Sequence, residues 1–170
     1  MNLKVALLAA AMLVTTSVAA NTLTKIRETG AITIGIRESS YPLSYLDDKQ
    51  QPIGYHIDIC HRIVDAVRTK LSLPGLKVNY QPVTSQNRIP LVTNGTVDIE
   101  CGSTTNNEAR QKQVAFAPTT FVTYVRMAVK KSSGIKGLDE LNGKPVATTT
   151  GTTSVQLMRA HERGKHVDFK

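Results

Sequence analysis

The sequence has few aromatic residues and no long run of basic residues. Phe, Trp and Tyr make up 5% of its 170 residues, and Lys130-Lys131 is the longest basic run. Proteins that bind single-stranded nucleic acid combine a positively charged groove with aromatic side chains on which bases stack. The net charge of +8 therefore indicates a solvated basic surface and no nucleic-acid partner, and it leaves open a preference for small anionic ligands.

Cysteine is also scarce, since the chain has only Cys60 and Cys101. Their spacing does not fit zinc, and neither has the histidine and acid arrangement of a convincing nucleophile. In an oxidising compartment an even count favours a disulfide, with two buried free thiols as the alternative. The four histidines show no metal-ligand spacing with an acid, so we expect surface or packing roles for them, no metal and no cofactor.

Long hydrophobic runs are confined to the N-terminus. Met1 to Lys4 carries one positive charge, Val5 to Val14 is almost wholly apolar, and Ser17 to Ala20 offers small residues for cleavage. The apolar run is shorter than the about 20 residues that cross a bilayer, which disfavours a membrane anchor. We therefore predict a secretory signal peptide over residues 1–20 and an exported mature protein.

Apolar periodicity predicts an α/β organisation for the first part of the mature chain. A short helix over 22–28 precedes a strand over 31–36, a hairpin between Pro42 and Pro52, a helix that begins at Asp58 as N-cap, a strand over 77–83, a helix capped by Asn87 and a strand over 97–101. The order strand, helix, strand, helix, strand is typical of a parallel sheet.

A second α/β unit is predicted after Arg110. We expect a strand over 123–129, a short helix within 134–143, a strand over 144–149, a turn at 151–153, a helix over 154–163 and the start of a strand over 166–169. The sequence therefore ends in the middle of this second unit.

Three loops that follow predicted strands carry both hydroxyl groups and an arginine. They are residues 37–40, residues 84–88, and residues 102–105 with Arg110 shortly after. Ligands bind beyond the carboxyl ends of strands in open parallel sheets, and arginine meets a carboxylate with two parallel hydrogen bonds. Each arginine alone is more simply a surface residue, but their shared position predicts a site for a small ligand with two carboxylates. The turn at 151–153 begins a helix and could bind an anion through its backbone N–H groups.

The sequence resembles a known family, the periplasmic solute-binding proteins of polar amino-acid ABC importers, and most of all their glutamate/aspartate-binding branch. The matching stretches are Arg37–Ser40, Gly54–Asp58, Thr84–Pro90, Asn94–Asp98, Glu100–Asn107 and Gly151–Ser154. The resemblance implies a type II periplasmic binding protein-like fold, in which two α/β lobes close on ligand by a hinge. It implies lobe one over residues 21–121, and the hinge strand with an incomplete lobe two over residues 122–170.

The resemblance also implies a role for each polar residue of the loops. Arg110 would bind the α-carboxylate of an amino acid, while Arg37 and Arg88 would clamp a side-chain carboxylate. Hydroxyl-bearing residues are expected to complete the site: Ser85 beside the side-chain carboxylate, Ser103 and Thr105 near the α-amino group, and Thr152 and Thr153 over the α-carboxylate.

These expectations favour a monomeric periplasmic binding module. It would deliver L-glutamate or L-aspartate to the membrane permease of an ABC importer, without catalysis. The second interpretation is a periplasmic enzyme on the same scaffold, similar to cyclohexadienyl dehydratase. Against it, the loops offer no evident acid or base apart from Glu38 and Glu108. A third interpretation is the sensor lobe of a receptor.

Overall fold

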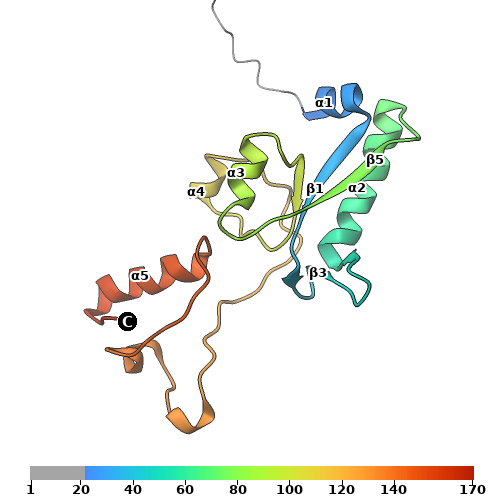
Figure 1. Ribbon diagram of the computed structural model, residues 1–170. Helices are drawn as coiled ribbons and strands as arrows, with labels where there is room; N and C mark the ends of the chain where they lie inside the picture. The colour runs from blue at the N-terminus through green and yellow to red at the C-terminus, as the bar shows by residue number, and fades with distance from the viewer. Residues whose placement is uncertain (1–21) are drawn as a thin grey trace, which may run out of the picture.

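A three-stranded parallel sheet lies at the centre of the protein, whose computed structural model describes residues 22–170 (Figure 1). Its strands are β1 (Ala31–Ile36), β5 (Lys77–Pro82) and β6 (Ile99–Cys101), in the order β5-β1-β6. The central strand pairs Ile34 with Tyr80 on one side and with Ile99 on the other. The predicted parallel sheet is confirmed, although its third strand begins later than predicted. The predicted signal peptide lies outside the described residues.

Helices α1 (Thr22–Thr29), α2 (Tyr55–Leu71) and α3 (Arg88–Thr93) flank this sheet. Figure 1 shows α2 and α3 on opposite sides of it. The alternating isoleucines of β1 and the apolar stripe of α2 form the core, because both elements bury one face against the other. The buried core residues are Ile26, Ile32, Ile34, Ile36, Ile57, Cys60, Val64, Leu71, Leu76 and Cys101.

The start of α2 differs from the prediction. The helix begins at Tyr55 after Gly54, so Asp58 lies in its first turn and is not the N-cap. Gly54 has a φ of 127°, and a Cβ there would lie 2.6 Å from the carbonyl oxygen of Leu43. Carbonyls of the preceding hairpin accept hydrogen bonds from the first helical N–H groups, as Leu43 does from His56 at 2.9 Å. Backbone contacts therefore replace the side-chain cap that the sequence indicated.

The hairpin itself agrees with the prediction. Strands β2 (Ser39–Ser40), β3 (Ser44–Leu46) and β4 (Pro52–Ile53) form a small antiparallel sheet in that order. Its strands β3 and β4 contact α2, and its Ser44 binds the backbone of Arg37, the residue that follows β1.

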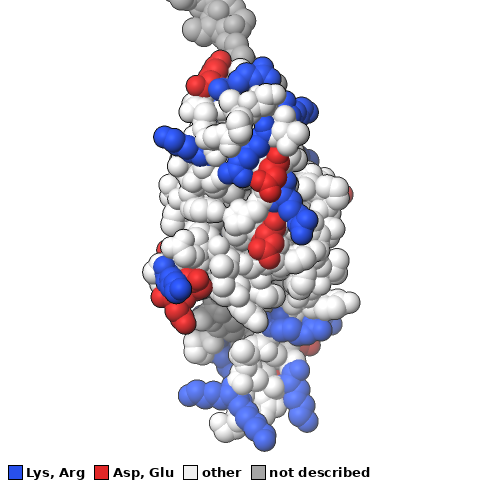
Figure 2. Space-filling view, turned by 90° about the vertical axis from the view of Figure 1, so that its right-hand side faces the viewer, with Lys and Arg blue, Asp and Glu red and all other residues white. Residues whose placement is uncertain are grey.

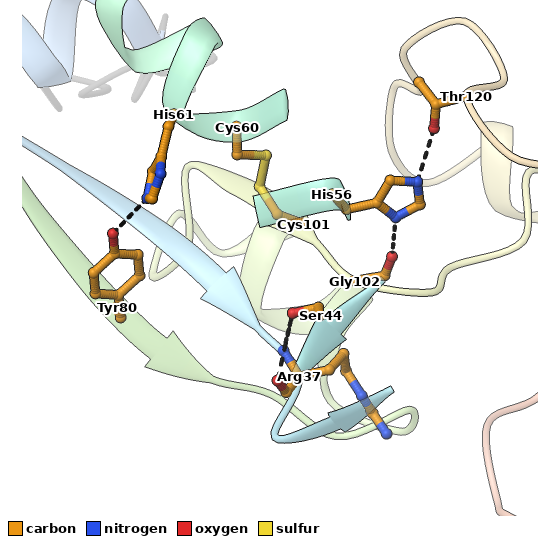
Figure 3. Close-up of a disulfide and its surroundings, with 9 residues drawn as sticks. All are labelled: Arg37, Ser44, His56, Cys60, His61, Tyr80, Cys101, Gly102 and Thr120. Carbon is orange, nitrogen blue, oxygen red and sulfur yellow. Dashed lines mark hydrogen bonds between the residues drawn. A yellow bond between two sulfur atoms is a disulfide. The ribbon is translucent and has the colours of Figure 1, made fainter. Parts of the chain in front are cut away.

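A disulfide joins α2 to the end of β6 (Figure 3). Cys60 and Cys101 lie 41 positions apart in the sequence, with their Cα atoms 6.4 Å from each other. Closing a loop of this length stabilises the fold by about 4 kcal/mol in the chain-entropy account. The even cysteine count predicted this bridge, and it anchors the loop that begins at Gly102.

A connecting segment, residues 112–130, leads away from the sheet without helix or strand (Figure 1). The predicted strand over 123–129 is therefore wrong. Its apolar residues alternate, but they are exposed, and within residues 22–170 no strand pairs with them. A segment with alternating apolar residues forms a strand only where a neighbouring strand accepts and donates its backbone hydrogen bonds.

The C-terminal segment, residues 131–170, contains η1 (Lys131–Ser133), η2 (Leu138–Leu141) and α5 (Thr153–Lys165). The two predicted helices are confirmed, the shorter one as a 3₁₀ turn. The predicted strands over 144–149 and 166–169 do not form regular strands. They nevertheless approach each other, because Lys170 N–H donates to Lys144 O at 2.9 Å and Val146 N–H donates to Lys170 O at 2.6 Å. This is the hydrogen-bond pattern of a parallel pair.

Candidate functional site

Arg37 follows β1 directly and is held by two serines. Its backbone N–H donates to the buried Ser44 Oγ at 2.9 Å, a contact drawn in Figure 3, and its Nε donates to Ser40 Oγ at 3.3 Å. Another guanidinium nitrogen, Nη1, is buried without a hydrogen-bond partner. Arg37 is therefore fixed at its base and keeps donors free at its tip.

Arg88 begins α3 after a loop that bonds to itself. Thr84 N–H donates to Asn87 Oδ1 at 2.7 Å, and Asn87 N–H donates to Thr84 Oγ1 at 3.1 Å. Asn87 precedes the helix as predicted, but its side chain closes this loop and does not cap the helix. The Arg88 side chain is buried, with the residue 3% exposed, and its Nε and Nη1 have no partner. A buried cation with unpaired donors is costly, so this position favours an anionic ligand.

Arg110 lies on α4 (Glu108–Gln111), a single turn after the loop at the end of β6. The side chain of Asn107 caps this turn by accepting from Arg110 N–H at 3.0 Å. The buried guanidinium donates to Thr105 O at 2.9 Å and to Gly151 O at 3.0 Å. Arg110 thus joins the sheet side of the site to the C-terminal segment.

The predicted hydroxyl residues occupy different parts of the site. Ser103 Oγ donates to Ser40 Oγ at 3.3 Å, which links the loops after β6 and β1. Thr152 Oγ1 donates to Thr149 O at 2.7 Å and precedes α5, whose first residue is the half-buried Thr153. A cleft of about 400 Å³ lies between the loops and is lined by Arg37, Glu38, Ser39, Val83, Thr84, Ser85, Gln86, Thr149 and Thr150. The structure therefore brings Arg37 and Ser85 to one cleft, with Thr149 and Thr150 in place of Thr152 and Thr153.

A larger hollow of about 630 Å³ shares no lining residue with this cleft. It is bordered by α2, α3, β6 and the connecting segment, and its wall includes many apolar side chains. Of the predicted residues, Arg88, Ser103 and Thr105 line this hollow. We refer to Arg37, Arg88 and Arg110 as the arginine cluster. Arg37 lines the smaller cleft, Arg88 lines the larger hollow, and Arg110 donates to Gly151 O.

Burial governs the electrostatics of the arginine cluster. Burial lowers the pKa of Arg88, Glu100 opposes this effect, and Arg110 and Arg37 add to it. The pKa of Arg110 is lowered in the same way by burial, again against the influence of Glu100. Glu100 is thus the acid that the three cations share.

Sequence reasoning missed Glu100 as a site residue. It lies in β6 between two residues that pack against or belong to the core, Ile99 and Cys101. The signal that could have identified it is an acidic residue inside a short apolar strand, directly before the polar loop that begins at Gly102. A carboxyl group at such a position needs a specific reason to be there.

His56, which we expected to have a surface or packing role, bridges two functional segments (Figure 3). Its Nδ1 contacts Gly102 O, and its Nε2 lies 2.9 Å from Thr120 Oγ1. Because a carbonyl only accepts, neutral His56 donates from Nδ1 and accepts at Nε2 from the threonine hydroxyl. The start of α2 therefore links the loop after β6 to the connecting segment.

Gly151 brings the C-terminal segment against the loop at residues 84–88. It has a φ of 80°, and a Cβ on it would lie 2.5 Å from the carbonyl oxygen of Ser85. Only glycine allows both this backbone conformation and this approach.

Neither a metal-binding cluster nor a membrane-spanning helix is found within residues 22–170. No group of three His, Cys, Asp or Glu side chains in this range is placed to hold a metal ion. Helices long and apolar enough to cross a membrane are also missing from this range.

Comparison with known proteins agrees with this geometry. Residues 32–169 match the bacterial extracellular solute-binding proteins, family 3. The chain belongs to this family. The expected two-lobe periplasmic binding protein fold is confirmed, and the glutamate/aspartate branch is supported by the relatives described next.

The family members that resemble the chain in sequence include two bacterial transport proteins. An L-glutamate/L-aspartate-binding protein of Pseudomonas aeruginosa is 56% identical over 85% of the chain and 48% of the relative. A glutamate/aspartate import solute-binding protein of Escherichia coli K12 is 52% identical over 82% of the chain and 46% of the relative. The chain thus spans about half the length of these curated relatives.

Solved structures of the family show the same fold. An ancestral amino acid-binding protein, AncCDT-1, described as a precursor of cyclohexadienyl dehydratase, matches with a TM-score of 0.70 and 29% identity over 82% of the chain and 60% of that protein. A cysteine-binding protein of Campylobacter jejuni matches with a TM-score of 0.68 and 25% identity over 88% of the chain and 58% of that protein.

Proposed function

We propose that the protein captures L-glutamate or L-aspartate and delivers it to the membrane permease of an ABC importer. The observation that carries this proposal is the set of buried guanidinium nitrogens without partners, on Arg37 and Arg88. The side-chain carboxylate of such a ligand supplies the acceptors that these donors lack. Charge-assisted hydrogen bonds of this kind contribute about 1.5–3 kcal/mol each. The names of the similar transport proteins support the same ligand class.

Within this proposal the two ends of the ligand bind to different arginines. Arg110 takes the α-carboxylate, while Arg37 and Arg88 clamp the side-chain carboxylate. The other proposed contacts are Ser85 to the side-chain carboxylate, Ser103 and Thr105 near the α-amino group, and Thr152 and Thr153 over the α-carboxylate. The cleft wall formed by Thr149 and Thr150 adds two further hydroxyls beside Ser85.

The proposed cellular setting follows from the same assignment. Residues 1–20 act as a signal peptide, and the mature protein works as a monomer in the periplasm. Residues 21–121 form the ligand-binding lobe, and residues 122–170 contribute the hinge and the beginning of the second lobe. No cofactor takes part.

An amide NMR titration of the full chain with L-glutamate tests this function. We expect saturable shifts in the loops after residues 36, 82 and 101, since their donors change partner. L-Arginine serves as the control, because its side chain places a cation against the arginine cluster. Shifts with both amino acids, or with neither, would contradict the proposed ligand class.

Enzymatic turnover on the same scaffold is a second candidate function. Glu38 and Glu108 are exposed, but Glu100 is a half-buried acid with a buried Oε1 beside the arginines, and a lyase needs such a group for proton transfer. The structural likeness to a precursor of cyclohexadienyl dehydratase, itself described as an amino acid-binding protein, gives this candidate a defined reaction to test. We expect no consumption of prephenate by the full chain; measurable consumption that Glu100→Gln abolishes would favour the enzyme.

A further inference from the structure

Glu100 is half-buried, and its Oε1 is buried without a hydrogen-bond partner. It projects toward Gly102, where even a Cβ would collide with Oε1 and would lie 2.7 Å from Cγ of Arg37. The carboxyl and the stem of Arg37 therefore share the space that a side chain at residue 102 would fill.

Charged or titratable side chains face Glu100 from four elements or loops. Arg37 follows β1, His56 lies on α2, Arg88 on α3 and Arg110 on α4. None of these four side chains is within hydrogen-bonding distance of Glu100 among the described residues. Glu100 therefore balances the charge of the arginine cluster without occupying the donors that a ligand needs.

The protonation of Glu100 is set by two opposed effects. Burial raises its pKa, while the nearby Thr104 hydroxyl, Arg88, Arg37 and His56 lower it. A carboxylate that binds to Arg37 and Arg88 brings a second negative charge to the same group of cations. Because a like charge disfavours ionisation, the pKa of Glu100 rises further when such a ligand is bound.

We propose that Glu100 makes the capture of acidic amino acids proton-linked: when a ligand carboxylate binds to Arg37 and Arg88, Glu100 takes up a proton. The added proton goes to the carboxylate oxygen of Glu100 and comes from solvent, so one negative charge on the protein is replaced by one on the ligand. This inference rests on the proposed function. A neutral ligand such as glutamine brings no second charge and causes no uptake.

The pH dependence follows from the sign of this shift. Between the lower pKa of Glu100 in the free protein and its higher pKa in the complex, binding consumes protons. Affinity for L-glutamate therefore falls as pH rises through this window, by at most about tenfold per pH unit for one linked proton. Above and below the window Glu100 has the same charge in both states, and affinity does not change with pH.

Isothermal titration calorimetry of the full chain tests the inference. L-Glutamate is titrated at several pH values between about pH 5 and pH 8, where the carboxylates of the free ligand are ionised. At each pH, two amine buffers of different ionisation enthalpy that buffer at that pH are compared. The dependence of the binding heat on buffer ionisation enthalpy gives the number of protons taken up. We expect uptake in the wild-type chain and none in Glu100→Gln, which keeps the shape of the side chain and removes its charge.

Two variants serve as controls. Glu108→Gln removes an exposed acid of α4, and His56→Gln removes the titratable neighbour on α2. Glu108→Gln is expected to retain the proton uptake of the wild-type chain, and His56→Gln is expected to retain uptake at a higher pH, because His56 lowers the pKa of Glu100. Uptake that persists in Glu100→Gln, or that disappears only in His56→Gln, overturns the inference because the proton then binds elsewhere.

The remaining outcomes separate the inference from the proposed function. Glutamate binding without proton uptake at any pH overturns the role of Glu100 and leaves the function intact. No glutamate binding at all overturns both. If Glu100→Gln does not fold, carbon NMR of the Glu100 carboxyl in the wild-type chain decides instead: its pKa must rise on addition of L-glutamate, and an unchanged pKa rejects the inference.

Discussion

Arg88 illustrates how a buried cation can remain available to a ligand. Its loop fixes the backbone through Thr84 and Asn87, while two guanidinium nitrogens are buried without a partner. The cost of this arrangement is offset at a distance by Glu100, which opposes the effect of burial on the Arg88 pKa. Glu100 thus balances the charge of Arg88, while a ligand supplies the hydrogen-bond acceptors for its guanidinium.

Arg88→Ala is predicted to weaken L-glutamate binding by at least about tenfold, because at least one charge-assisted hydrogen bond is lost. L-Glutamine should lose much less, since its amide does not need the side-chain clamp. Calorimetry with both ligands measures the difference, and Arg62→Ala on the exposed face of α2 is the matched control. Equal losses for both ligands would reject the assignment of Arg88 to the side-chain carboxylate.

Arg110→Ala is predicted to weaken every amino-acid ligand to a similar extent. Its proposed partner is the α-carboxylate, which all amino acids share, and its bonds to Thr105 and Gly151 also hold the loop and the C-terminal segment together. Comparing L-glutamate, L-aspartate and L-glutamine measures this uniformity. A loss confined to the two acidic ligands would mean that the roles of Arg88 and Arg110 are exchanged.

At the scale of elements, the sheet and its helices could be predicted because their apolar periods are long and unbroken. Strand β1 and helix α2 each contribute several residues to one core. Boundaries were less predictable, since the start of α2 depends on carbonyls of the hairpin that no local pattern reveals. The segment over 123–129 has the alternation of a strand, but a strand forms only with a partner.

The residues of the site also differ in how far a local sequence pattern could predict them. The loops with arginines could be found because parallel strands place their carboxyl ends at one edge. Glu100 could not be found in this way, because its importance depends on which cations face it in space. The need for glycine at position 151 likewise follows only from how closely its Cα approaches the carbonyl of Ser85 in the fold.

Gly151→Ala is predicted to separate the C-terminal segment from the loop at 84–88. An added methyl group would lie 2.5 Å from Ser85 O at a φ of 80°, so the turn must move. We expect weaker L-glutamate binding and new amide shifts at Ser85 and Arg110, whose guanidinium bonds to Gly151 O.

Gly164→Ala is the matched control for this change. Gly164 lies in α5, and a Cβ on it meets nothing within 4 Å. Alanine should stabilise the helix by up to about 1 kcal/mol without affecting binding. If Gly151→Ala binds as tightly as Gly164→Ala, the approach of the turn to Ser85 is not required for capture.

At the scale of the whole molecule, charge is distributed unevenly. On the face drawn in Figure 2, basic and acidic side chains mix in the upper half, whereas basic side chains gather at the lower end. That end corresponds to the stretch at 126–136, which contains four cations and no acid. Exposure and positive charge thus coincide in a stretch whose one regular element is the short 3₁₀ helix η1.

Brief trypsin digestion is predicted to cut first at Arg126, Lys130 or Lys131, which are exposed in or directly after the connecting segment. The product should be a resistant fragment that contains the sheet and its disulfide, because the core lies within residues 26–101. Mass spectrometry identifies the cuts. An earlier cut at Arg62 or Lys77 would show that the sheet opens more readily than the connecting segment, against the proposed boundary between residues 121 and 122.

The two hydrogen bonds of the Arg110 guanidinium have a further consequence. A free arginine side chain samples many rotamers, and immobilising one at an interface costs about 0.5–1.5 kcal/mol. Here the bonds to Thr105 O and Gly151 O already restrict that freedom, so the loss of conformational entropy accompanies folding and not capture. Arg110 is preorganised, and a ligand that reaches it gains the electrostatic attraction with little of the entropic penalty.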